Sequence, residues 1–471
     1  MHDIHTTSRR AFLVASTVGF AGMQFGRVAQ AVTADASAPR AGKAKSTILF
    51  FLSGGSSHID TFDMKPEAPL EYRGPFQTIA TTAPDIRLSE HLPLLAQQAH
   101  HLALVRSVGA SVNTNDHHAG YYYNLTGHEA DPTFLSLGNN RTPYADDWPF
   151  MGTVVAAKRP PHAYLPNAIT LPQKPSPAPY TRPGQFAARL GVEHDPLYLE
   201  GSLEQPLKFS APSLELQQGM TGGRVAARRE LLTAMDDARR QLDRDAKTQT
   251  WTRQQERAFS LLASSRTTTA FDVSGEPESL RNRYGQNVNG MSLLLARRLV
   301  EAEVPFITVF WKEDDPGLGK KCASAGGWDT HANNFNCLKD DLLPAFDRAF
   351  SALIEDLAAR NLLDQTLLMV TSEMGRKPKI GDPRSGNIAG AGRDHWTHCL
   401  TDVLAGGGIR GGQVYGSTDR RGEYPSDRPV TPAHVTKTVY HAMGLPDLEA
   451  TDREGRPYNL LAEGAPITSL F

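Results

Sequence analysis

The stretch TLLMVTSEMGRKP, residues 366–378, joins an apolar run to a polar ending. Residues 366–372 carry no charge, and a continuous apolar run of this length is typical of a parallel strand that is buried on both faces. Glu373 and Arg376 follow where that strand would end. Because open α/β sheets bind ligands beyond the carboxyl ends of their strands, this ending is a candidate functional segment.

Other apolar runs predict the remaining strands of the same sheet. They span residues 46–52, 101–108, 304–311 and 398–407. Helices are predicted between them over 338–360, where apolar residues recur every three or four positions, from Asn282 towards the run at 304–311, and over 432–443. Strands that alternate with helical crossovers favour an α/β fold with a doubly wound, largely parallel sheet and helices on both faces.

One region departs from this alternation. Residues 160–212 are rich in Pro and Gly and predict long surface loops, whereas residues 214–266 are charged and favour helix. We therefore expect a loop-rich and helical insertion from residue 160 to about residue 290. It would interrupt a single domain that spans residues 32–471.

Two more polar segments follow apolar runs. GGWDTH, residues 326–331, holds Asp329 and His331, and GRDHWTH, residues 392–398, holds Asp394 and His395. Carboxylates and imidazoles at several strand ends are the groups that a metal-centred hydrolytic site requires. The alternative interpretation is that these residues only cap helices or turns, as Asp often does after a glycine.

Composition limits the classes of function. The chain has 471 residues, 40% of them apolar and 21% charged, which suits a globular protein with one large core or two smaller ones. A formal net charge of −2 without a basic stripe gives no electrostatic case for nucleic-acid binding. Cys322, Cys337 and Cys399 lack close spacing, so we expect no cysteine-based zinc site, and one disulfide with open pairing is compatible with the sequence.

The amino terminus has the features of an export signal. A twin arginine, Arg9 and Arg10, precedes a modest apolar run over 11–26, and Ala29 and Ala31 form a small-residue cleavage site. The run is short for a membrane helix, so no stable membrane span is expected. We predict a twin-arginine signal peptide over residues 1–31 and a periplasmic or cell-surface location.

Several phrases resemble one known family. GGSSHIDTFDMKP, LRNRYGQNVNGMSLLLARRLVEAEVPFITV, GGWDTH, LLDQTLLMVTSEMGRKP, AGRDHW and AGGGIRGGQVYGSTDRRG are similar to the exported family DUF1501, usually grouped with the alkaline phosphatase and sulfatase superfamily. The resemblance implies an alkaline phosphatase-like fold, metal ligands after the strands, and transfer of phosphoryl or sulfuryl groups. It also implies a nucleophile about nine residues before a Thr-Gly pair.

The sequence departs from the superfamily pattern in three places. Counting nine residues back from Thr126-Gly127 leads to His117, and no Cys-x-Pro-x-Arg occurs, which excludes a formylglycine sulfatase. Ser53-Gly54 stands where relatives have Asp-Gly, so His58 or Asp60 would have to supply the missing ligand. Glu373-Met374 replaces the superfamily's Asp-His.

These comparisons define the predicted site. Asp329, His331, Glu373, Asp394, His395, His58 and Asp60 are the candidate ligands of a divalent metal such as Zn, Mn, Fe or Ca. His117 is a candidate ligand or nucleophile. Arg376 and Arg393 are candidate anion clamps, because a guanidinium group is a forked donor, although surface ion pairs would explain them equally well.

Two functions remain open at this point. The first is an exported metal-dependent hydrolase of sulfate or phosphate esters, acting on an anionic small molecule or a polysaccharide. The second is a catalytically degraded binding or scaffold protein of the cell envelope that keeps the fold.

Overall fold

The structure of the protein is a computed structural model. The structure describes residues 42–109, 115–176, 179–212, 269–313, 317–323, 327–381, 392–452 and 455–471. The predicted signal peptide over 1–31 and the charged segment 214–266 lie outside these residues. None of the helices in the described ranges is long and apolar enough to cross a membrane.

The centre of the fold is an eight-stranded sheet with the order β14-β4-β13-β10-β1-β9-β5-β6. β1 lies in the middle and pairs in parallel with β10 on one side and β9 on the other. β13 runs antiparallel to both of its neighbours, β10 and β4. The strands are β1 (Ser46–Phe51), β4 (Leu102–Val108), β5 (Ala168–Leu171), β6 (Leu197–Tyr198), β9 (Phe306–Phe310), β10 (Thr366–Thr371), β13 (Leu400–Ala405) and β14 (Gln413–Tyr415).

All five predicted strands are confirmed, and the α/β fold with a largely parallel sheet is confirmed with them. The prediction of only surface loops over 160–212 was wrong, because β5 and β6 in this region extend the sheet beyond β9. These strands have four and two residues, too few to show a period against the surrounding Pro and Gly.

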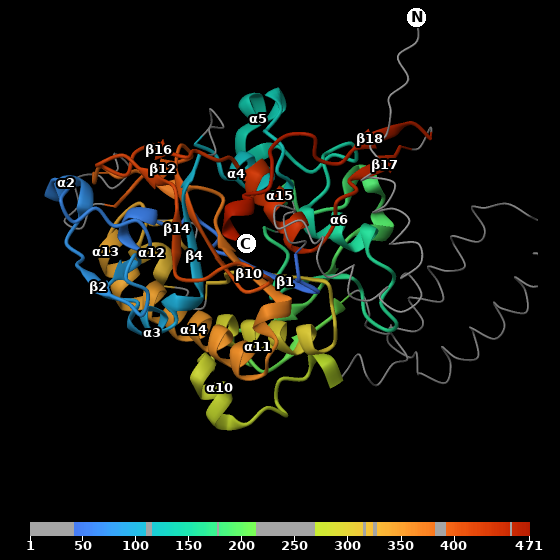
Figure 1. Cartoon of the computed structure of the whole chain (residues 1–471), viewed down its shortest axis with the longest axis horizontal. Helices are drawn as coiled ribbons and strands as arrows, with labels where there is room; N and C mark the ends of the chain where they lie inside the picture. The colour runs from blue at the N-terminus through green and yellow to red at the C-terminus, as the bar shows by residue number, and fades with distance from the viewer. Residues whose placement is uncertain are drawn as a thin grey trace, which may run out of the picture. The chain divides into compact units, whose positions relative to one another are not determined.

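Helices cover both faces of the sheet. Ile48 and Phe50 of β1 lie in one buried core with α11 (Val288–Glu301) and α14 (Leu343–Ala359). Leu49 and Phe51 lie in a second core with α4 (His117–Thr126), α6 (Met151–Lys158) and α15 (Pro432–Ala442). Successive residues of a strand point to opposite faces, so each strand contributes to both cores. Figure 1 shows the two helix groups on either side of β1 and β10.

The helix predicted from Asn282 is two helices, which corrects that prediction. α10 (Glu278–Tyr284) ends before Gly285, whose φ of +89° lies outside the helical region, and α11 begins at Val288. The side chain of Asn287 caps α11 by accepting a hydrogen bond of 2.8 Å from the backbone N–H of Gly290. The helices over 338–360 and 432–443 are confirmed, the first one opening with a π-helical turn at Leu338–Leu342.

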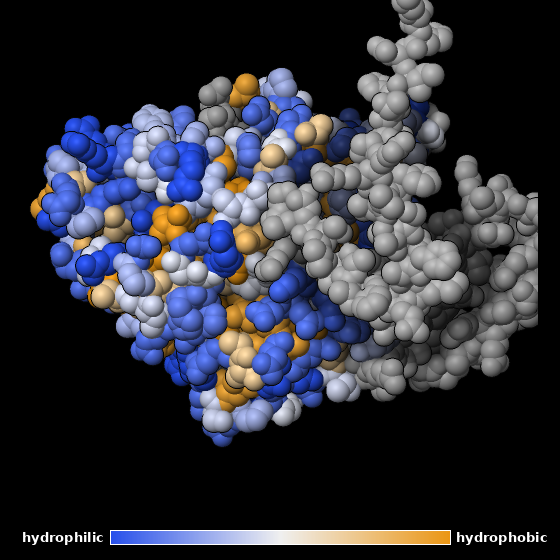
Figure 2. Space-filling view, in the orientation of Figure 1, coloured by the Kyte–Doolittle hydropathy of each residue, from blue (hydrophilic) through white to orange (hydrophobic). Residues whose placement is uncertain are grey.

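The visible surface is mainly hydrophilic, with apolar residues in small separate groups (Figure 2). Most large apolar side chains of the described residues are instead enclosed in the two cores.

Candidate metal centre

The carboxyl ends of β1, β9 and β10 carry the loops that build the site. The three strands are parallel neighbours, so their ends meet at one edge of the sheet. Gly54, just after β1, has a φ of +120°, and a Cβ atom there would lie 2.4 Å from the backbone N of Asp329. Only glycine permits this approach, and it brings the loop after β1 against the segment that carries Asp329.

His117 enters the site as the first residue of α4. The Asp116 side chain caps this helix by accepting a hydrogen bond of 2.8 Å from the His118 backbone N–H. The helix packs closely on the loop after β10, because a Cβ on Gly120 would lie 2.4 Å from the carbonyl oxygen of Glu373. The sequence DHHAGYYYNLTG therefore places His117 beside Glu373.

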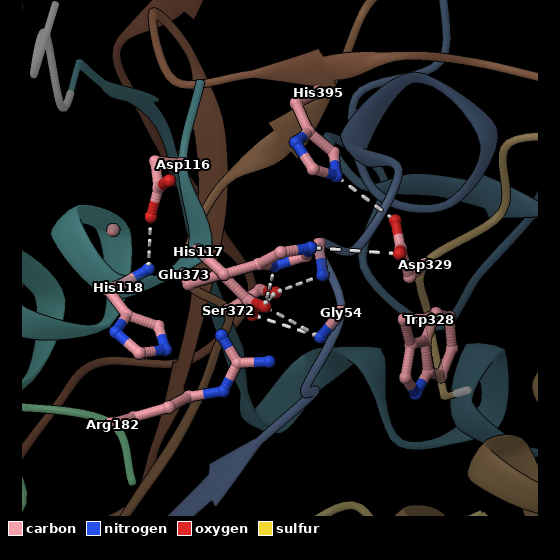
Figure 3. A network of polar contacts seen from close by, with 12 residues as sticks. Gly54, Asp116, His117, His118, Arg182, Trp328, Asp329, Ser372, Glu373 and His395 are labelled. Carbon is pink, nitrogen blue, oxygen red and sulfur yellow. Dashed lines mark hydrogen bonds and ion pairs between the residues drawn. The ribbon is translucent and has the colours of Figure 1, made fainter. Parts of the chain in front are cut away.

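The possible metal-ligand atoms of three side chains lie close together. Ligand atoms of His117, Asp329 and His395 all lie within 4.8 Å of one another, and they form the metal-binding group found among the described residues. His395 Nε2 lies 3.1 Å from Asp329 Oδ1, and His117 Nε2 lies 3.6 Å from Asp329 Oδ2. Figure 3 shows both imidazole rings pointing toward the Asp329 carboxylate.

The outer nitrogens of the two rings have partners of their own. His117 Nδ1 is 2.9 Å from Glu373 Oε1, and His395 Nδ1 is 2.8 Å from the carbonyl oxygen of Asn115. Since both outer partners are acceptors, each Nδ1 can donate its proton to them, and a metal bound in place of a proton would use the lone pair of each Nε2. Metal-ligating histidines show this pattern, in which an outer acceptor fixes the tautomer. The donor set therefore fits a divalent metal.

Glu373 lies behind His117 rather than among the three grouped residues. Its carboxylate also accepts the Gly54 backbone N–H at 2.8 and 3.0 Å and is completely buried. Burial would raise the pKa of Glu373, but the contacts with His117 outweigh burial and lower it. An ionised Glu373 can thus orient His117, which differs from the direct ligand role predicted for it.

The remaining predicted ligands of this segment lie at the edge of the group. His331 Nε2 is 2.8 Å from Asp329 Oδ1. Asp394 Oδ1 accepts the backbone N–H of His395 at 2.8 Å and is 3.9 Å from His331 Nδ1. Its side chain is 31% exposed, so Asp394 is the most accessible of the predicted ligands in this group.

Arg376 balances the charge of Asp329. The fully buried guanidinium group donates to an Asp329 carboxylate oxygen and to the carbonyl oxygens of Gly54 and Gly55. Burial would raise the pKa of Asp329, but Arg376 and the surrounding histidines hold it well below its usual range. With its donors directed at these protein groups, Arg376 is not placed as an anion clamp, which corrects that prediction.

A second buried cluster contains three other predicted site residues. Arg393 Nε and Nη2 donate to the two Asp60 oxygens at 2.8 and 2.9 Å, and both side chains are fully buried. His58 Nε2 lies 2.8 Å from the carbonyl oxygen of Gly422. The structure therefore corrects three predictions: His58 and Asp60 are not in the metal-binding group, and Arg393 is not an anion clamp.

A disulfide bridge closes the loop that carries two of the site residues. Cys322 and Cys337 are bonded and enclose Asp329 and His331, while Cys399 is free and buried. The sequence left this pairing open.

Arg182 lies at the site but was not among the predicted site residues. It comes from the segment between β5 and β6, and Figure 3 shows its guanidinium group pointing toward Glu373 and His117. No sequence signal could have found it, because TRPG, residues 181–184, has the composition of an ordinary turn.

The sequence matches the family described as "Protein of unknown function (DUF1501)" over residues 44–471. No functionally curated protein matches it. Similar solved structures include a phosphonate monoester hydrolase from Silicibacter pomeroyi, with 13% identity, a TM-score of 0.41, and coverage of 90% of this chain and 76% of that chain.

Two further structures are the PsFucS1 sulfatase from Pseudoalteromonas sp. and an alkaline phosphatase from the Antarctic bacterium TAB5. The sulfatase has 10% identity and a TM-score of 0.37, with coverage of 94% of this chain and 73% of that chain. The phosphatase has 10% identity and a TM-score of 0.34, with coverage of 86% and 100%. At these sequence identities and TM-scores, the similarity does not indicate the activity of this protein.

Proposed function

The chain belongs to the DUF1501 family, and from its candidate metal centre we propose that it is an exported metal-dependent hydrolase of sulfate or phosphate esters. One observation carries the proposal. The Nε2 atoms of His117 and His395 face a single carboxylate, Asp329, while both Nδ1 atoms are held by outer acceptors. This is a preorganised mixed nitrogen and oxygen site at the usual ligand-binding edge of an α/β sheet.

The residues of the site have separate tasks. His117, Asp329 and His395 would hold the metal, which when bound would polarise an oxygen of the ester. Glu373 accepts a hydrogen bond from His117 Nδ1, which would leave Nε2 as the ligand atom of this ring when the metal is bound. Since the metal would occupy Nε2 and Glu373 holds Nδ1, His117 acts as a ligand and not as the covalent nucleophile.

The test is the metal content of wild-type protein purified without chelator, compared with His395→Ala and His117→Ala. We expect both variants to lose bound metal and any hydrolysis of an aryl phosphate or aryl sulfate in the presence of Zn or Mn. His398→Ala is the matched control, because His398 is three residues from His395 but packs on Trp396 and Tyr424. Equal metal content in wild type and both ligand variants would contradict the proposal.

The alternative is a binding or scaffold protein of the cell envelope. It is favoured by the ion pair between Arg376 and Asp329, through which the chain already balances the charge of its central carboxylate. A wild-type protein without bound metal and without hydrolysis in any added metal would support this alternative.

Export is part of the proposal and has its own test. Replacing both Arg9 and Arg10 with Lys is expected to leave the protein in the cytoplasmic fraction, because the paired guanidinium groups define a twin-arginine signal. Mass spectrometry of the wild-type protein from the envelope fraction should show a chain that begins at Val32. An intact amino terminus in that fraction would contradict the prediction.

A further inference from the structure

Arg182 is a cation with a buried, unpartnered donor beside the candidate metal centre. We propose that Arg182 binds the tetrahedral anionic group of the substrate, a sulfate or phosphate ester. This inference rests on the function proposed above and adds to it the residue that recognises the ester.

The position of Arg182 is set by α4. Its guanidinium carbon Cζ lies 4.5 Å from the centre of the Tyr121 ring, a distance typical of a cation–π contact. Tyr121 is almost completely buried and follows His117 by one helical turn, so the two side chains share a face of α4. The stacked guanidinium group points toward Glu373, the partner of His117 Nδ1 (Figure 3).

The donors of Arg182 are only partly used. Nε donates to Ser176 Oγ at 3.1 Å, whereas Nη1 is buried and has no hydrogen-bond partner among the described residues. Within the same ranges, no carboxylate forms an ion pair with it at 4.0 Å or less. A buried donor without a partner is unfavourable, and an incoming anion would satisfy it.

The two other arginines of this region are already occupied. Arg376 donates to Asp329 and to two backbone carbonyl groups, and Arg393 is held by both oxygens of Asp60. The guanidinium groups of Arg376 and Arg393 therefore donate to protein groups within their own clusters. Arg182 Nη1, in contrast, has no hydrogen-bond acceptor among the described residues. This contrast is why the anion-binding role falls to Arg182.

The charge of Arg182 acts on the residues around the site. Its guanidinium group points toward the buried carboxylate of Glu373, which itself contacts His117 (Figure 3). Arg182 thus supplies positive charge where the two carboxylates of the site would otherwise repel an anion.

A tetrahedral oxyanion fits these donors better than a neutral group. A guanidinium group presents parallel N–H donors that can bind two oxygens of a sulfate or phosphate, a geometry that lysine cannot reproduce. A sulfate ester and a phosphate ester share this chemistry, so the two must be compared directly.

The experiment measures anion binding rather than turnover. Wild type, Arg182→Ala and Arg182→Lys are titrated with inorganic phosphate and, separately, with sulfate by calorimetry, both after chelator treatment and with added Zn or Mn. Metal content and thermal unfolding are recorded for each variant. The matched control is Arg421→Ala, since the Arg421 Cζ lies 4.8 Å from the Tyr72 ring and its side chain is 55% exposed.

We expect Arg182→Ala to weaken binding of the preferred anion by about 10- to 100-fold at unchanged metal content, Arg182→Lys to weaken it less, and Arg421→Ala to have no effect. Whichever of the two anions loses more affinity between wild type and Arg182→Ala, sulfate or phosphate, is the preferred group. Anion binding through Arg182 without any hydrolysis would uphold this inference while refuting the hydrolase. Equal binding in wild type and Arg182→Ala, or no binding by wild type, would overturn it.

Discussion

Replacing Asp329 with asparagine is expected to remove bound metal and hydrolysis together. The carboxylate is the common partner of His117, His331, His395 and Arg376, so an amide there weakens every one of these contacts. Loss of an outer partner alone costs roughly 10- to 100-fold in metal affinity, and loss of a ligand should exceed that. Metal analysis and an aryl ester assay measure both effects.

The same substitution should also lower stability. It leaves the fully buried Arg376 without its charge partner, and breaking a buried ion pair on one side costs about 3–5 kcal/mol. Asp394→Asn is the control, because Asp394 lies at the partly exposed edge of the group and should change stability little. An Asp329→Asn protein that keeps its metal would show that the carboxylate is not a ligand.

Replacing Arg393 with methionine is expected to lower the free energy of unfolding by about 3–5 kcal/mol, because it leaves the buried Asp60 carboxylate without its partner. Denaturant unfolding measures this loss. Metal content should stay at the wild-type level, since Arg393 makes its ion pair outside the metal-binding group.

The double variant Arg393→Met, Asp60→Leu should recover part of the lost stability, since no uncompensated charge remains buried. The recovery should be incomplete, because Asp60 also accepts hydrogen bonds from Ser57 at 2.6 Å and Asn334 at 2.9 Å. A single Arg393→Met variant with wild-type stability and weaker substrate binding would instead restore the anion-clamp role.

The sequence predicted the central strands, and it predicted that the loops following them would lie close together. β1 and β10 are continuous apolar runs because both of their faces are buried, and that composition is visible in the sequence. Asp329 and Glu373 follow parallel strands on either side of β1, so topology alone brings their loops together. The antiparallel direction of β13 was not predictable, because an apolar run has the same composition in both directions.

The errors concern pairs that are distant in the sequence. Asp60 and Arg393 are 333 residues apart, and nothing near either residue indicates that each completes the other's charge. Arg182 is similar, because its relation to His117 depends on the stack with Tyr121 and not on any local pattern. The types of residue in the site are therefore visible in the sequence, whereas the partner of each residue depends on contacts between distant segments.

The bridge between Cys322 and Cys337 makes the order of the Asp329 loop dependent on redox conditions. It spans a sequence separation of 15 residues, and in the chain-entropy account a ring of this size disfavours the unfolded chain by about 3 kcal/mol. While the bridge is intact, the unfolded chain around Asp329 and His331 therefore has fewer alternative conformations. A reducing environment would return that conformational freedom to the loop, and the geometry around the Asp329 carboxylate would become less well defined.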